Sequence, residues 1–373
     1  MPRSVSANRE STRLLLKALS EPWAVNALSE SEWDLLVRVA RVSNLLGTVH
    51  ARIEEANAMD HVPQVVQVQL RSEWAATAYR TRLVSWELDR LARALGRLSV
   101  PVVLLKGAAY IVQGLACAAG RAVSDVDILV PRERLPEVEQ ALLSHGWEAT
   151  PLEPYDDRYY RQWSHEIPPL RYGGSALELD VHHAILPPLG RIRPDPVMLV
   201  GRSVATGETP FRALAREDQV LHAALHLFQD SDCTNRLRDL VDIDALIREF
   251  AALPGFATEL VARAGEHGAS RPLWYALHHA TRYLQTPVPT QTRDRLKRHA
   301  PPLPVRRLMD WLVGSVLMPP DPDRGYPWTA RFASWALRMR SVWLRFPPRL
   351  FFLHSIIKAV PWLRQGAARP QAM

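Results

Sequence analysis

Two aspartates one residue apart, Asp125 and Asp127, lead directly into the apolar residues 128–130. Side chains alternate between the two faces of a strand, so residues i and i+2 point the same way. Two carboxylates held side by side repel each other unless a cation or a proton neutralises them. Carboxylate oxygens suit Mg2+, and a bound Mg2+ can neutralise and orient phosphate groups. The pair alone can also mark a solvated strand end, so its meaning depends on its surroundings.

The segment before the pair could bind an anion. Residues 98–105 predict a short buried strand, residues 106–109 (Lys-Gly-Ala-Ala) a tight turn, and residues 110–119 a buried helix. A glycine turn that feeds a helix N-terminus presents backbone N–H groups to an anion, and Lys106 adds a positive charge beside them. Gly107 could equally belong to an ordinary strand-to-helix turn.

A third carboxylate comes from a predicted hairpin farther along the chain. Its arms are residues 165–172 and 176–182, joined by two glycines. Apolar and polar residues alternate in the second arm, which places Glu178, Asp180 and His182 on one face. His182 could support Asp180 or be a structural histidine. We expect the hairpin to bring Asp180 beside the aspartate pair.

Three carboxylates on adjacent strands behind a glycine turn resemble the catalytic core of the DNA polymerase β-like nucleotidyltransferase superfamily. The chain is most similar to its uncharacterised nucleotidyltransferase family of bacteria, in which a Lys-Gly turn often replaces the superfamily's Gly-Gly or Gly-Ser. The similarity rests on residues 105–108 (Leu-Lys-Gly-Ala), 125–130 (Asp-Val-Asp-Ile-Leu-Val) and 177–182 (Leu-Glu-Leu-Asp-Val-His), and covers roughly residues 95–250. It implies an α+β fold, with a mixed β-sheet and flanking helices.

The resemblance also implies a reaction, the transfer of a nucleoside monophosphate from an NTP to an acceptor with release of pyrophosphate. Asp125 and Asp127 would bind two Mg2+ ions, or Mn2+ instead. Asp180 would be the third metal-binding carboxylate and would act as, or orient, the base. Two metal ions would clamp the attacking and leaving oxygens of an in-line displacement.

Further residues are candidates for binding the nucleotide. The resemblance implies that Gly107 and the backbone around Ala108 lie against the triphosphate and that a basic residue of a later helix, Arg236 or Arg238, lies near the nucleotide. We add Lys106, for its charge, and Ser124, which directly precedes the aspartate pair. Ala108 departs from the superfamily pattern, because it has no hydroxyl where a small polar residue is usual.

Residues 213–250 read as strongly helical and contain a second polar cluster. Arg238 and Asp242 are four apart, on one helix face. Arg236 or Arg238 could neutralise a triphosphate. The alternative is a surface ion pair between Arg238 and Asp242, worth a few tenths of a kcal/mol. His222 and His226 are also four apart, and we expect them on a helix face packed against the sheet.

Composition narrows the class of protein. The chain has 373 residues, 47% of them hydrophobic, so it can form two or three domains with a sizeable core. A net charge of +7 suits an anionic partner such as a nucleotide or nucleic acid. Two cysteines, Cys117 and Cys233, cannot form a disulfide framework. The first residues do not resemble a secretory signal, so we expect a cytoplasmic protein.

The chain divides into four predicted regions: an N-terminal helical region (1–95), a catalytic α/β core (96–205), a helical region packed on the core (206–300) and basic, aromatic C-terminal helices (301–373). In the first region we expect helices over residues 9–19, 29–46 and 62–95. The last of these has an apolar stripe that should face the core: Leu83, Trp86, Leu88, Leu91 and Leu95.

The C-terminal residues 331–364 mix aromatic and basic side chains. The aromatic ones are Trp335, Trp343, Phe346, Phe351, Phe352 and Trp362, and the basic ones are Arg331, Arg338, Arg340, Arg345, Arg349, Lys358 and Arg364. Such a segment could lie weakly on an anionic membrane surface. The alternative is a pair of helices, broken at Pro347-Pro348, that cover the core and expose arginine. No apolar run reaches the length needed to span a bilayer.

The sequence leaves the substrates open. The acceptor could be a small molecule, a peptide, a sugar or RNA, and no residue indicates which NTP is used. A different class of function also remains, a nucleotide-binding sensor or scaffold that uses the same fold without catalysis.

Overall fold

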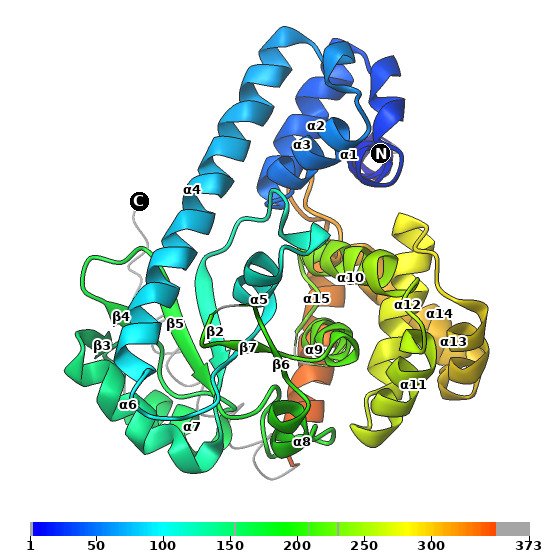
Figure 1. The fold of residues 1–373 in the computed structure, drawn as a ribbon. Coiled ribbons are helices and arrows are strands. Elements are labelled where there is room, and N and C mark those ends of the chain that lie inside the picture. Colours follow the sequence, from blue (N-terminus) through cyan, green and yellow to red (C-terminus); the bar gives the residue numbers. More distant parts are fainter. Residues whose placement is uncertain (1–2, 153, 208, 230, 348–373) are drawn as a thin grey trace, which may run out of the picture.

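The computed structural model describes residues 3–152, 154–207, 209–229 and 231–347 and shows one mixed β-sheet surrounded by helices (Figure 1). This is the α+β nucleotidyltransferase-type architecture expected from the sequence. A single cluster of buried apolar side chains extends through it from Leu14 in the first helix to Leu337 in the last.

Four helices precede the sheet: α1 (Arg3–Ser20), α2 (Glu30–Val42), α3 (Leu46–Glu55) and α4 (Gln64–Leu95). A capping box starts α2, because the Ser29 hydroxyl accepts from the Glu32 amide at 3.3 Å while the Glu32 carboxylate accepts from the Ser29 amide at 3.0 Å. The expected single helix over residues 29–46 is wrong. It ends at Val42, because Asn44 takes a left-handed conformation (φ 55°) and α3 begins separately.

Helix α4 is long, as expected, and reaches from the N-terminal helices to the sheet (Figure 1). Its predicted stripe is correct for Leu88, Leu91 and Leu95, which are buried. Trp86 is 51% exposed and does not belong to the core. The neighbouring Glu87 is buried instead and accepts from the indole N–H of Trp147 at 2.9 Å. The hydrogen bond between Glu87 and Trp147 therefore determines which side of α4 faces the sheet at this point.

The sheet has the strand order β3-β4-β5-β2-β1-β7-β6. Its strands are β1 (Val103–Leu104), β2 (Asp125–Leu129), β3 (Trp147–Ala149), β4 (Leu170–Tyr172), β5 (Glu178–His182), β6 (Val204–Ala205) and β7 (Arg212–Ala213). The two parallel pairs are β2 with β5 and β1 with β7, and the other neighbours are antiparallel. The predicted hairpin exists as β4 and β5, whereas β3 was not predicted.

The strand expected over residues 98–105 shrinks to β1, Val103–Leu104. Pro101 has no N–H to give to a ladder, and Ser99 has a left-handed backbone with φ 46°. The expected turn at residues 106–109 is already the first turn of a helix. That helix, α5 (Lys106–Gln113), ends at Gly114, whose φ of 64° makes it a left-handed cap.

Two helices lie between strands β2 and β4, α6 (Leu135–Ser144) and the unpredicted α7 (Pro154–Trp163). After the hairpin the helices are α8 (Pro196–Gly201), α9 (Arg216–Phe228), α10 (Leu237–Phe250), α11 (Phe256–Glu266), α12 (Ser270–Leu284), α13 (Thr290–Leu296), α14 (Leu303–Val316) and α15 (Trp328–Arg345). Figure 1 shows α9 beside the sheet and α11 to α14 farther from it. Most side chains of α9 and α10 are buried.

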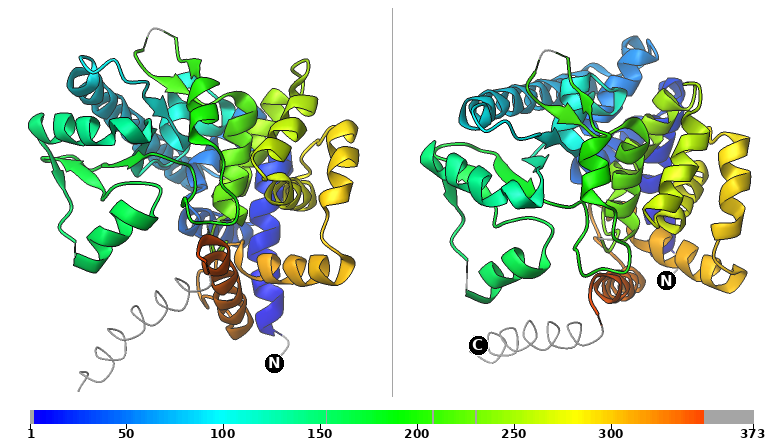
Figure 2. Two further views of the ribbon diagram at one scale, coloured as in Figure 1. Left: turned by 90° about the horizontal axis from the view of Figure 1, so that it is seen from below. Right: turned by 60° about the horizontal axis from the view of Figure 1, so that its bottom comes forward.

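None of the helices in the described part of the chain is both long and apolar enough to cross a membrane. In the views of Figure 2, α14 and α15 lie at one end of the molecule, close to the N-terminus. Several residues of the aromatic and basic C-terminal segment lie outside the described residues: Arg349, Phe351, Phe352, Lys358, Trp362 and Arg364.

Candidate active site

Strand register brings the three predicted carboxylates together. In the parallel pair of β2 and β5, Asp127 is the register partner of Asp180, and Asp125 lies two residues before Asp127 on the same strand. One carboxylate oxygen from each of the three lies within 4.8 Å of the other two. Three oxygen donors at this spacing are a donor set that fits a hard divalent cation. The predicted geometry is therefore present.

Asp127 is the most buried of the three, at 4% exposure. Its Oδ1 atom accepts from Nζ of Lys106 at 3.1 Å and from Nε2 of His182 at 3.0 Å. Burial alone would raise the pKa of Asp127, but the Lys106 ammonium and the His182 hydrogen bond together hold it well below its ordinary value. Asp127 is thus a permanent anion. His182 shares the site and does not merely fill the core.

Asp180 has the opposite electrostatic character. Burial, then repulsion from Asp127 and Glu166, raises its pKa to about 7. At neutral pH a proton therefore partly offsets the crowding of negative charge. A bound cation would replace that proton, because metal ligands bind in their deprotonated form.

The carboxylates open into a cavity of about 280 Å3 between the sheet and the helices α5, α9 and α10. Its walls contain the three aspartates together with Lys106, Gly107, Tyr110, Arg121, His165, Glu166, His182, Ala223, His226, Arg236, Arg238, Asp239 and Asp242. A larger hollow of about 1300 Å3 lies between α1, α12 and α14. We place the chemistry in the smaller cavity, because it holds the converging carboxylates.

The remaining nucleotide-binding candidates fall into two groups. Lys106, Gly107, Arg236 and Arg238 line the cavity with the aspartates. Ala108 is buried inside α5, and Ser124 is exposed with its hydroxyl 3.3 Å from Oδ1 of Asp125. The structure brings neither of these two to the cavity wall.

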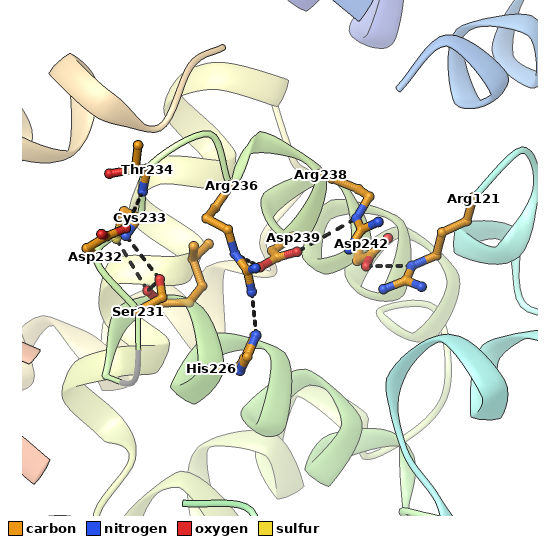
Figure 3. Close-up of polar contacts among 11 residues, drawn as sticks. Arg121, His226, Ser231, Asp232, Cys233, Thr234, Arg236, Arg238, Asp239 and Asp242 are labelled. Carbon is orange, nitrogen blue, oxygen red and sulfur yellow. Dashed lines mark hydrogen bonds and ion pairs between the residues drawn. The ribbon is translucent and has the colours of Figure 1, made fainter. Parts of the chain in front are cut away.

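Arg236, the N-cap residue of α10, and Arg238, in the first turn of that helix, line one side of the cavity, which we call the basic wall. Figure 3 shows these two arginines with the residues that they contact. Arg236 pairs with Asp239 at 2.6 Å and contacts the Nε2 atom of His226. Burial, with the neighbouring charges of Lys106 and Arg236, holds the pKa of His226 well below its ordinary value, so it stays neutral. Arg238 donates to the backbone oxygen of Ala122 at 2.9 Å.

The alternative of an exposed Arg238–Asp242 pair does not match the structure. Asp242 is buried and accepts instead from Nε of Arg121 at 3.0 Å (Figure 3). Both partners of this ion pair are less than a tenth exposed. Burial raises the pKa of Asp242, against the opposing effect of Arg121. The pair joins the loop before β2 to α10, so it fixes the basic wall relative to the carboxylates.

Gly107 has a steric reason to be glycine. A Cβ atom built at this position would clash with Nη1 of Arg121 and would lie 3.1 Å from Cγ2 of Val123. The preceding Lys106 has a left-handed backbone, with φ 43°, which is strained for a residue with a side chain. This conformation carries the Lys106 ammonium to Asp127. The glycine therefore makes room for a buried guanidinium beside the carboxylates.

We expect Gly107→Ala to lower the free energy of unfolding by about 1–3 kcal/mol, because the added methyl group must displace Arg121 from a packed position. Urea denaturation followed by circular dichroism measures this. Gly173→Ala is the matched control, since a Cβ there meets no atom within 4 Å. Equal stability of the two variants would contradict this steric account.

A family model described as uncharacterised nucleotidyltransferase matches residues 29–285, well over half of the chain. The chain belongs to this family. No curated protein matches the chain. The matched residues include the whole sheet and the helices α9 and α10, so every residue of the cavity falls within the family region.

Sequence reasoning identified His182 but missed other residues of the cavity, among them His165, Glu166 and Arg121. His165, Glu166 and His182 form a second group of potential metal ligands, with donor atoms within 4.8 Å of one another. An isolated β-bridge between Glu166 and His182 brings Glu166 there. The sequence signal was the pair His165-Glu166 at the start of the predicted hairpin arm, two residues that have no reason to begin a buried strand. No feature of the sequence around Arg121 indicated that this residue lies in the cavity.

Proposed function

We propose that the protein is a Mg2+-dependent enzyme that transfers a nucleoside monophosphate from an NTP to a hydroxyl-bearing acceptor and releases pyrophosphate. The observation that carries this proposal is the convergence of Asp125, Asp127 and Asp180 in a cavity that also contains a lysine and arginines. Three clustered carboxylates are costly for a fold unless a cation uses them. Membership of a nucleotidyltransferase family supports the same reaction.

Each carboxylate has a distinct part in this proposal. Asp125 and Asp127 would hold the Mg2+ ions, which neutralise the triphosphate and polarise the α-phosphorus. Asp180 would complete the metal site and would act as, or orient, the base that takes the proton of the attacking hydroxyl. The new bond joins the acceptor oxygen to the α-phosphorus, and the bond from that phosphorus to pyrophosphate breaks.

The basic residues of the cavity would bind the triphosphate. Arg236 is the N-cap residue of α10, and Arg238 lies in its first turn, four residues before Asp242 of the buried pair with Arg121. Lys106 stands nearest to the carboxylates. Guanidinium groups suit bidentate contacts with phosphate oxygens. Mn2+ could replace Mg2+, since the nearby imidazoles of His165 and His182 suit a transition metal better than Mg2+.

The pKa of Asp180 makes both stability and metal binding depend on pH. Its folded-state pKa of about 7 is above its ordinary value of 3.8, so the folded protein binds this proton more tightly than the unfolded chain. The resulting contribution to the free energy of unfolding is fully present below the ordinary pKa and is lost as pH rises to the folded-state pKa of about 7. We therefore expect Asp180→Asn to raise the free energy of unfolding of the metal-free protein at pH 8 by roughly 1–3 kcal/mol. Thermal unfolding across pH measures this.

Protonation of Asp180 competes with the binding of Mg2+ to its carboxylate. We expect Mg2+ to raise the melting temperature of the wild type at pH 8 and progressively less below pH 7, and to have no effect on Asp180→Asn. Glu178→Gln is the control, because Glu178 lies two residues away on β5, pairs with Arg171 at 2.6 Å and does not line the cavity. A Mg2+ effect that persists in Asp180→Asn would argue against Asp180 as a ligand.

The proposed reaction is tested with purified protein, Mg2+ and each NTP labelled on the α-phosphate. A cell extract supplies the acceptor, and mass spectrometry detects nucleotidylated products. The proposal predicts products with the wild type and none with Asp125→Asn. If the wild type binds NTP tightly in calorimetry but releases no pyrophosphate with any acceptor, the protein is instead a nucleotide sensor or scaffold. Candidate acceptors are small molecules, peptides, sugars and RNA.

A further inference from the structure

The outward side of α14 and α15 carries aromatic side chains where a helix surface usually carries polar ones. On α15, Trp328 is 78%, Phe332 49% and Trp335 58% exposed, while Trp311 on α14 is 46% exposed. Three of these rings form one continuous group, because the ring centroid of Phe332 lies 6.3 Å from that of Trp311 and 5.9 Å from that of Trp335. An exposed apolar patch of this kind marks a contact surface.

Helical spacing shows that this side of α15 is separate from its packed side. Trp328, Arg331, Phe332, Trp335 and Arg338 recur at spacings of three and four residues and are all exposed. The opposite stripe is buried and holds α15 on the rest of the protein, with Ala330, Ala333, Leu337 and Ser341. The first helix of the expected pair is thus present as α15, which covers the core and exposes arginine, but it exposes aromatic rings as well. The second helix of that pair would lie outside the described residues.

The C-terminal segment that contains α15 carries charge of one sign. Residues 324–373 contain nine Arg or Lys and no Asp or Glu, whereas the whole chain has a net charge of +7. The preceding 323 residues therefore have a net charge of −2, and all of the excess positive charge resides in the segment that begins just before α15. Arg331 and Arg338 place part of this charge beside the exposed rings.

We propose that Trp311, Trp328, Arg331, Phe332, Trp335 and Arg338, which we call the aromatic-basic face, bind the surface of an anionic phospholipid bilayer. Tryptophan and phenylalanine enter the boundary between headgroups and acyl chains, and arginine stays at the anionic headgroups. Helix α14 also exposes the aliphatic side chains of Leu303, Val305 and Leu308, which suit a lipid boundary and could not stack on nucleic-acid bases. Figure 2 shows α14 and α15 together at one end of the molecule.

Vesicle co-sedimentation of the full chain tests this proposal. We expect the wild type to sediment with vesicles of phosphatidylcholine mixed with phosphatidylglycerol, not with phosphatidylcholine alone, and to be released by added salt. Arg331→Gln with Arg338→Gln should weaken binding roughly fivefold for each arginine removed. Phe332→Ala with Trp335→Ala should weaken it by about tenfold or more.

Trp86→Ala is the matched control, because Trp86 on α4 is also about half exposed but lies outside the aromatic-basic face. It should bind vesicles like the wild type, and thermal unfolding should show that all the variants remain folded. A wild type that ignores anionic vesicles, or variants that bind like the wild type, would overturn the proposal. A dimer in sedimentation equilibrium that Phe332→Ala with Trp335→Ala dissociates would assign the face to a second copy of the chain instead.

Discussion

Asp127→Asn is expected to reduce nucleotidyl transfer by about a thousandfold, or about 4 kcal/mol of transition-state stabilisation. Asp127 is the buried member of the carboxylate group and holds its negative charge against burial through Lys106 and His182. Asparagine keeps the size but removes the charge that a cation needs. The measurement is the rate of pyrophosphate release with NTP, Mg2+ and an identified acceptor.

Loss of folding could imitate this loss of activity, so a second variant is needed. Asp125→Asn removes a less buried carboxylate of the same group and should lower the rate to a similar extent with little effect on stability. Glu178→Gln changes the register partner of Asp125 on β5, outside the cavity, and should keep wild-type activity. Full activity in Asp125→Asn would show that the carboxylate group is not the catalytic centre.

Arg121→Met is expected to lower the free energy of unfolding by about 3–5 kcal/mol, because it leaves the Asp242 carboxylate buried without its partner. The two side chains meet at 3.0 Å and both are less than a tenth exposed. Adding Asp242→Leu to this variant removes the stranded charge and should restore much of the lost stability. Urea denaturation of both variants and the wild type measures the effect.

An exposed ion pair provides the comparison. Arg134 and Glu137 meet at 2.7 Å on the surface, so Arg134→Met should cost about 1 kcal/mol or less. If Arg121→Met proves no more costly than Arg134→Met, the buried pair does not hold the loop before β2 to α10. The position of the basic wall would then need another explanation.

The carboxylate group was predictable because it depends on local rules. The alternation of side chains on a strand placed Asp125 beside Asp127, and the alternating pattern around Asp180 identified β5. The resemblance to a known family then supplied their adjacency, which the register of Asp127 with Asp180 confirms. Element boundaries were less certain, since Asn44 and Gly114 end helices through backbone conformation more than through hydrophobic pattern.

The rest of the cavity depends on contacts between distant parts of the chain. Arg121 pairs with a residue 121 positions away, and its burial follows from how α10 packs against residues 116–118 just before Arg121, which no local pattern encodes. Glu166 reaches the site through a single bridge to His182. The exposure of Trp86 and the burial of Glu87 likewise depend on Trp147, 60 positions away from Glu87.

The most direct test of the central claim is a crystal of the protein soaked with Mn2+ and a non-hydrolysable NTP analogue. Anomalous scattering locates Mn2+ without reference to function. We predict an anomalous peak coordinated by Asp125, Asp127 and Asp180, with the triphosphate extending toward Arg236 and Arg238. A well-occupied nucleotide with no anomalous peak at these three carboxylates would contradict the claim that they form its metal site.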